Sequence, residues 1–446
     1  MNLFTTGKNI LHSVLTDERD RKNLYKIALP SFLIHFIAAI LALAIMFIMT
    51  RTLGTTQYGL FTFAFSIIFL IVNLSTNAID ILTVREIPAL VSTGKMELWK
   101  GFCNWSSRLI LLIGIIIPLL AALCIWAFVY YFHVFKESTY TLPILFALTS
   151  IPFYSLTSYY ASTLRGQNKP VISLLPDNII KPLAFILSFI AVYFISRQMT
   201  LRNAILLNSA SFVAGFIFTF FAYKRTAYSV EGGAQYDLKK WRASWRSLFL
   251  LTVIFSINSK LDVLMLGFLK ASGDVGVYAA ADRVAGALTV FLMVMNTITA
   301  ATISKLHTLN EKQKLQNMVT KITRGVMLLS LPAYSFIIIF SKYILHFCGP
   351  NFSDGQTALI IICTAQLISI AFGPVGNYAV MTGNEKLNIR YSAIKIFLAI
   401  ALNLALTPAL GINGTAIATG LSIVFWNAGM FITLKKKTGL STWIFG

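Results

Sequence analysis

The sequence predicts an all-α polytopic membrane protein with about twelve transmembrane helices, and three observations support this. Hydrophobic residues make up 57% of the chain and charged residues 12%, and the mean hydropathy is +0.74, outside the range of soluble globular domains. The apolar residues gather in long stretches separated by short polar connections. The 37 Lys and Arg residues are concentrated in alternate connections, as in a multi-pass protein that obeys the positive-inside rule.

Each apolar stretch is long enough to cross about 30 Å of hydrocarbon as a helix. The predicted spans, in chain order, are 27–50, 58–82, 109–132, 141–163, 171–195, 203–223, 247–268, 275–300, 325–348, 355–381, 391–410 and 412–434. The first stretch is too long for a cleaved signal peptide, and no small-residue cleavage site follows it. We therefore expect it to be the first helix of the mature protein.

The distribution of the cations predicts the orientation. Of the 37 Lys and Arg residues, 27 lie in connections on one side of the spans and only 5 in connections on the other. The basic side includes both ends of the chain, the loop that carries Arg85, Lys95 and Lys100, and residues 224–246 and 301–324. We expect a bacterial inner-membrane protein with both termini in the cytoplasm. The opposite connections are short, so we expect no soluble domain there.

Other classes of protein are disfavoured. The net charge of +21 is spread over short loops beside spans, whereas a nucleic-acid-binding protein gathers its basic residues on one folded surface. Neither a disulfide framework nor a zinc site is suggested by the four scattered cysteines, Cys103, Cys124, Cys348 and Cys363. The histidines form no metal-binding pair and no Walker-type loop is present, so we expect no metal, no cofactor and no ATP hydrolysis.

The chain also contains a weak internal repeat. Gly59 and Gly276 each begin an even-numbered span, and Gly166 and Gly383 each follow a later span, with an offset of 217 residues in both cases. We predict an N-terminal six-helix bundle at 1–223, a cytoplasmic linker at 224–246 and a C-terminal six-helix bundle at 247–446. Because each half has an even number of spans, the bundles would be parallel, with a central cleft that suits a transporter.

The linker contains a glycine pair followed by cations and two tryptophans. Glu231, Gly232 and Gly233 predict a flexible turn, and Trp241 and Trp245 predict an interfacial helix. Anchoring in the headgroup layer is the favoured role, and a hinge between the halves is the alternative.

Charged residues inside spans are costly and are the best candidates for a site. Asp177 and Lys181 have i, i+4 spacing and can form an ion pair, either as a structural element or as part of a cavity. Lys260 and Asp262 lie near the centre of one span, and their spacing points them in different directions.

Three further ionisable residues lie within predicted spans. Arg283 follows Asp282, so these side chains also diverge, and pairing between this helix and the one that carries Lys260 is the structural alternative. Lys395 lies deep enough for a cavity and shallow enough to snorkel. His35 is a candidate proton carrier, although a lone membrane histidine more often hydrogen-bonds a neighbouring helix.

Two helices are expected to be interrupted. Pro152 and the pair Gly373–Pro374 lie in corresponding spans of the two halves. Such interruptions indicate discontinuous helices and possible hinges.

Four segments share their residues and their order with a known transporter family. They are Arg51–Phe61, Val84–Ile87, Leu261–Gly267 leading into Gly276–Ala281, and Phe372–Gly376 leading into Met381–Glu385. These segments resemble the polysaccharide transporter and O-antigen flippase branch of the multidrug/oligosaccharidyl-lipid/polysaccharide (MOP) exporter superfamily. The similarity runs through nearly the whole chain and implies the fold of that superfamily, which includes the multidrug-and-toxin extruders (MATE).

The resemblance implies a function. It implies a non-enzymatic flippase that moves undecaprenyl-pyrophosphate-linked oligosaccharide across the inner membrane by alternating access, for O-antigen, capsule or exopolysaccharide synthesis. The cations expected to bind the pyrophosphate are Lys181, Lys260, Arg283 and Lys395, and the candidates for ion coupling are Asp177, Asp262 and His35. Its partners would be the lipid-linked glycan, membrane lipids and other glycan-assembly proteins, with no nucleic acid. A cation-coupled drug extruder, a membrane glycan polymerase and a structural scaffold are the alternatives.

Overall fold

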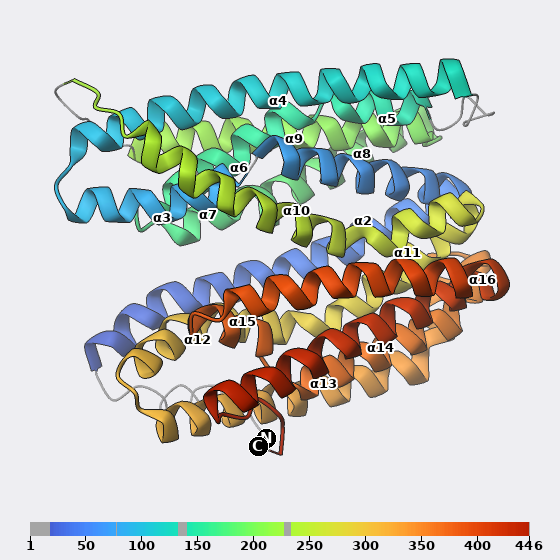
Figure 1. Ribbon diagram of the computed structural model, residues 1–446. Coiled ribbons are helices and arrows are strands. Elements are labelled where there is room, and N and C mark those ends of the chain that lie inside the picture. The colour runs from blue at the N-terminus through green and yellow to red at the C-terminus, as the bar shows by residue number, and fades with distance from the viewer. Residues whose placement is uncertain (1–17, 77, 133–140, 227–232, 446) are drawn as a thin grey trace. The chain divides into compact units, whose positions relative to one another are not determined.

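The computed structural model describes residues 18–76, 78–132, 141–226 and 233–445 (Figure 1). Nearly all of these residues are helical, and none of them forms a β-strand. The helices of the first part of the chain are α2 (Glu18–Thr76), α3 (Ile79–Ser92), α4 (Met96–Phe132), α5 (Thr141–Leu148), α6 (Ile151–Gly166), α7 (Pro170–Leu175), the π-helical turn η1 (Pro176–Ile180), α8 (Lys181–Ser196) and α9 (Leu201–Thr226).

The second part of the chain is built in the same way. Its helices are α10 (Leu238–Leu269), α11 (Ser272–Gly286), η2 (Ala287–Thr289), α12 (Val290–Thr308), α13 (Lys312–Cys348), η3 (Pro350–Gly355), α14 (Gln356–Ala371), α15 (Val375–Met381) and α16 (Glu385–Thr438). Two of the long helices contain a sharp break, α2 at Gly54 with φ 71° and α16 at Gly411 with φ 57°.

The helices fit the predicted multi-pass arrangement. Within the described residues, nine helical segments are long and apolar enough to cross a membrane. Two of these nine, Leu29–Ser92 and Glu385–Thr438, contain the breaks at Gly54 and Gly411, so each provides two crossings. The predicted span 141–163 corresponds to two consecutive helices, α5 and α6. The chain is therefore a multi-pass membrane protein of about twelve spans.

The described helices form two compact units. The first unit contains residues Ile40–Gly267 and Ala271–Gly276, and the second contains Met1–Ala39, Phe268–Lys270 and Val277–Gly446. In the first unit α6 packs against α3, α4 and α9, and α9 also packs against α8 (Figure 1). In the second unit α14 packs against α13 and α16. These units differ in their boundaries from the predicted halves 1–223 and 247–446, which stay a prediction.

The connections on the basic side are shorter than predicted. Arg85 lies inside α3, and α4 already begins at Met96, so most of the expected loop between the second and third spans is helical. Likewise, only residues 309–311 separate α12 from α13, within the expected loop 301–324. The hydrophobic run marks only the part of a helix that lies in lipid, because polar residues beyond it continue the same backbone hydrogen bonds in water.

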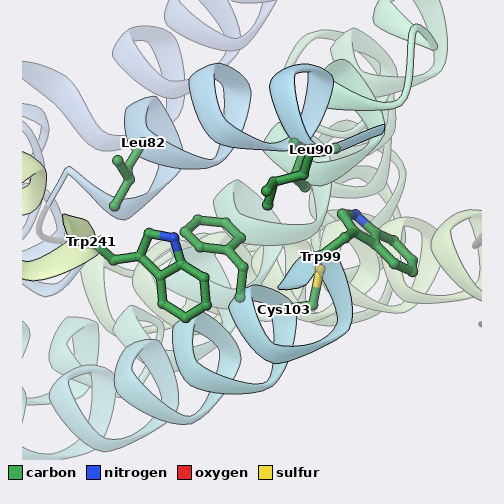
Figure 2. Close-up of a cluster of buried hydrophobic side chains, with 7 residues drawn as sticks. Leu82, Leu90, Trp99, Cys103 and Trp241 are labelled. Carbon is green, nitrogen blue, oxygen red and sulfur yellow. The ribbon is translucent and has the colours of Figure 1, made fainter. Parts of the chain in front are cut away.

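The described part of the predicted linker 224–246 is mostly helical. Residues 227–232 lie outside the described residues, α9 continues to Thr226, and α10 begins at Leu238. Trp241 is buried within the protein: it is 1% exposed and packs in a cluster with side chains from α3 and α4 (Figure 2). The other members of the cluster are Leu82, Ile87, Leu90, Trp99, Phe102 and Cys103.

Polar contacts hold the same segment in place. The Lys240 ammonium lies 2.9 Å from the buried carboxylate of Glu86, and the Gln235 backbone N–H donates to the carbonyl of Glu97 at 3.1 Å. Gly101 permits this approach, since a Cβ atom there would lie 1.7 Å from the Gln235 carbonyl oxygen. The start of α10 is thus a packed part of the first unit.

The two expected interruptions are present. The chain turns at Thr149 and Ser150, and α6 starts beside Pro152. In the second unit α14 ends at Ala371 and α15 starts at Val375, with Gly373 in the left-handed region at φ 72°. Proline lacks the N–H that would continue the preceding helix, which explains both breaks.

The C-terminal tail, residues 440–445, folds back onto the second unit. The Gln316 side chain and the Ser441 backbone exchange two hydrogen bonds of 2.7 Å, and the Thr323 hydroxyl donates to the Thr442 carbonyl at 3.1 Å. The Trp443 ring packs 4.6 Å from that of Phe372. The tail therefore lies directly against the break between α14 and α15.

Candidate functional site

Lys181 is the buried cation of the first unit. It lies in the span Pro170–Ser196, about 16 Å along the helix at 1.5 Å per residue, which is near the middle of a bilayer. The π-helical turn Pro176–Ile180 immediately precedes it. A π-turn inserts an extra residue into a helix and occurs frequently at functional sites.

Four groups surround the Lys181 side chain. Its ammonium forms the predicted i, i+4 ion pair with Asp177. It also lies 4.2 Å from the ring centre of Tyr154 on α6 and 4.6 Å from that of Phe212 on α9. Gly215 makes room for the lysine stem, because a Cβ atom there would lie 2.7 Å from its Cγ. Ring faces are electron-rich and stabilise an ammonium, so these contacts replace part of its hydration.

The two members of this ion pair differ in exposure. The Lys181 side chain is 10% exposed, whereas that of Asp177 is 41% exposed. A charge in a membrane span has a high free-energy cost, which an oppositely charged partner reduces. The lysine is therefore enclosed by protein groups, whereas Asp177 lies at the surface of the unit.

Lys260 and Asp262 lie on α10 in the same unit. The Lys260 ammonium lies 5.5 Å from the ring centre of Phe69, and the Asp262 carboxylate accepts a hydrogen bond of 2.9 Å from the Val263 backbone N–H. Both side chains are half-buried.

The remaining candidates lie in the second unit. Arg283 is exposed on α11, Lys395 is half-buried on α16, and His35 is half-buried on the part of α2 that belongs to this unit. The four candidate cations are therefore divided equally between the units. The structure brings Lys181 and Asp177 together, and it leaves the wider cationic cleft a prediction.

Sequence reasoning did not identify the aromatic partners. Tyr154 and Phe212 contact the buried Lys181, Phe69 contacts the half-buried Lys260, and Gly215 shapes the space for Lys181. One signal was available, because Phe212, Phe216 and Phe220 recur every four residues and so line one face of α9. The contact with Lys181 itself depends on how α8 packs against α9.

A metal site finds no support in the part of the chain that the structure describes. No group of three or more His, Cys, Asp or Glu side chains there could hold a metal ion.

Known membrane proteins share this fold. An inward-facing multidrug resistance MATE family transporter of the MOP superfamily superposes with a TM-score of 0.69 at 12% identity, covering 90% of this chain and 98% of that one. The lipid II flippase MurJ in an inward closed conformation also has a TM-score of 0.69, at 16% identity, covering 91% of this chain and 87% of that one. These likenesses confirm the predicted MOP-superfamily fold.

The sequence has a more specific relative and a family match. A probable low-salt glycan biosynthesis flippase, Agl15 of Haloferax volcanii, is 28% identical over 185 residues. That match covers 40% of this chain and 39% of the relative, so it spans about two-fifths of each protein. The model of the polysaccharide biosynthesis protein family matches residues 26–307, more than half of the chain. The chain therefore belongs to the polysaccharide biosynthesis protein family, as its sequence motifs predict.

Proposed function

We propose that the protein is a flippase that moves a lipid-linked oligosaccharide across the membrane. Three findings support this function: membership of the polysaccharide biosynthesis family, the fold of the MOP transporters, and the similarity to a relative named as a probable glycan biosynthesis flippase. The protein acts as a transporter and not as an enzyme.

The observation that best supports an anionic substrate is the Lys181 site. A lysine near mid-membrane is held between two aromatic rings and paired with an accessible carboxylate. A phosphate group of a lipid-linked glycan can replace that carboxylate, because Lys is a common phosphate ligand and phosphate forms strong charge-assisted hydrogen bonds. Substrate release would then restore the Asp177 pair, so the buried cation never lacks an anion.

The finer form of the proposal names the substrate. It is an undecaprenyl-pyrophosphate-linked oligosaccharide for O-antigen, capsule or exopolysaccharide synthesis, moved by alternating access. Lys181, Lys260, Arg283 and Lys395 contact the pyrophosphate at different stages, and Asp177, Asp262 and His35 are the candidates for ion coupling. The distribution of cations supports an orientation with both termini in the cytoplasm.

Leaflet-resolved labelling of lipid-linked oligosaccharide tests the proposal. Cells that lack the protein should hold the labelled glycan lipid on the cytoplasmic face, and the wild-type chain should restore its appearance on the outer face. Lys181→Met should not restore it. The matched control is Lys342→Met, which removes an exposed lysine from the span on α13. Normal labelling in cells without the protein would contradict the proposal.

A drug extruder is the second candidate, favoured by the accessible Asp177 and by the likeness to a multidrug MATE transporter. Efflux of cationic dyes from the same cells separates the two functions. Dye efflux that depends on Asp177, with normal glycan labelling, would favour the extruder. Glycan lipid that reaches the outer face but stays unpolymerised would favour the polymerase.

A further inference from the structure

Three turns of the second unit, far apart in sequence, surround a pocket of about 360 Å³. The turns are the connection between α12 and α13, the connection between α15 and α16, and the end of α16. The sequence places all three on the basic side of the membrane. The pocket therefore lies near the lipid headgroups on that side.

The charges of the pocket lining have one sign. Lys312 and Lys437 line it from two different helices, and His307 lines it from α12. Among the described residues that form the lining, none is acidic. Two carboxylates are adjacent in sequence to lining residues: Glu311, which pairs with Lys314 at 2.9 Å, and Glu385, the exposed first residue of α16. The lining itself favours an anion, because two lysines and no acidic residue contribute to it.

The polar groups of the pocket are fixed. Asn384 is only 6% exposed, and its amide donates to the backbone carbonyl and hydroxyl of Thr382 at 3.1 and 3.0 Å. It directly precedes the first residue of α16. Gly383 has φ 72°, and a Cβ atom there would meet no atom within 4 Å. The floor of the pocket is therefore open.

One wall of the pocket is held by the C-terminal tail. Leu440 lines the pocket, and the next residue, Ser441, exchanges two hydrogen bonds with Gln316 on α13. Thr323 holds Thr442 in the same way. These bonds fix the end of α16, and hence Lys437, before any ligand arrives. Such preorganisation reduces the entropy that binding must offset.

We propose that this pocket binds a phosphate group. Lysine ammonium groups are common ligands of phosphate and form charge-assisted hydrogen bonds with it. The phosphate belongs either to the headgroup of an acidic phospholipid or to a soluble phosphate compound, since both present the same anion. The proposal is independent of the flippase function, because none of the pocket residues belongs to the Lys181 site.

Matched variants separate the pocket from general electrostatics. Lys312→Gln with Lys437→Gln removes the two lining cations from α13 and α16. Lys321→Gln with Lys436→Gln removes two exposed cations from the same helices, outside the lining. Both double variants lose the same charge at exposed positions, so both should fold like the wild type, which circular dichroism and size-exclusion chromatography can check.

Two measurements on the full-length protein distinguish the sources of phosphate. Isothermal titration of inorganic phosphate into protein in phosphatidylcholine nanodiscs tests the soluble anion. Native mass spectrometry of protein from nanodiscs that also contain phosphatidylglycerol tests the lipid headgroup by counting retained lipids. The pocket variant should bind phosphate at least about tenfold more weakly, or retain fewer phosphatidylglycerol molecules, whereas the control should match the wild type.

The outcomes decide the proposal. Selective loss of phosphate binding in the pocket variant assigns the site to a soluble phosphate compound, and selective loss of retained phosphatidylglycerol assigns it to the headgroup. Equal losses in the two double variants would reduce the effect to surface charge and overturn the site. Absence of both kinds of binding in the wild type would also overturn it.

Discussion

Gly59 of α2 and Gly276 of α11 lie against each other in a reciprocal helix contact. A Cβ atom on Gly59 would lie 1.8 Å from the Ser272 carbonyl oxygen, and one on Gly276 would lie 2.1 Å from the Thr55 carbonyl oxygen. Thr55 and Ser272 are separated by the same 217 residues as the two glycines. The contact therefore pairs equivalent positions of the predicted repeat, as a duplicated helix would. Small residues at i and i+4 on both helices allow the two backbones to meet.

This contact predicts a large effect of small side chains. Gly276→Ala should lower the free energy of unfolding of the detergent-solubilised protein by about 1–3 kcal/mol or more, because backbone atoms cannot yield to the added methyl group. Gly286→Ala on the same helix is the control, since nothing lies within 4 Å of its Cβ position. Unfolding followed by tryptophan fluorescence measures both. An equal effect of the two substitutions would point to helix propensity and not to the contact.

The Lys181 ion pair predicts an asymmetric pair of substitutions. Asp177→Asn should destabilise the protein more than Lys181→Met, by up to about 3 kcal/mol, because it leaves the 10% exposed lysine without its anion while the reverse change leaves a 41% exposed carboxylate. The double variant should recover stability. Glycan transport should be lost in both variants that lack the lysine.

A double-mutant cycle of thermal unfolding, with leaflet labelling in parallel, measures these quantities. Additive stability effects would show that the two side chains do not interact. Transport by the stable double variant would remove Lys181 from the substrate path.

The buried position of Trp241 predicts a cost that an interfacial anchor would not have. Trp241→Ala should destabilise the first unit by about 3–5 kcal/mol, since its ring is 1% exposed and packs 5.2 Å from that of Phe102. Tyr236→Ala removes a half-exposed ring just before the same helix and should have little effect. Thermal unfolding compares the two. Similar small losses would restore the headgroup interpretation.

The close contact between Gly373 and the C-terminal tail predicts the effect of a substitution at this glycine. A Cβ atom there would lie 2.2 Å from the Thr323 hydroxyl and 2.5 Å from the Thr442 carbonyl, so Gly373→Ala should displace the tail. Hydrogen exchange at residues 440–445 should become faster. Gly383→Ala is the control because it has the same φ of 72° with no neighbour within 4 Å, so it introduces the same backbone strain alone. Equal exchange rates in the two variants would show that the close contact of Gly373 does not hold the tail in place.

Much of the fold followed from local properties of the chain. Span number and the breaks at Pro152 and Gly373–Pro374 were predictable, because hydrocarbon thickness fixes span length and proline lacks the N–H that would continue a preceding helix. The Asp177–Lys181 pair was predictable for the same reason, since i, i+4 spacing brings side chains together within one helix.

Contacts between helices were not predictable in this way. The sequence by itself determined a multi-pass helical membrane protein of the polysaccharide biosynthesis family and the residues that place charge inside its spans. Only the tertiary structure decided that Trp241 is buried, that Tyr154 and Phe212 flank Lys181, and that the tail closes one wall of a basic pocket. Helical periodicity shows which residues share a face, but the neighbour of that face depends on packing among helices distant in sequence, and in lipid this packing follows shape and polar contacts more than hydrophobicity.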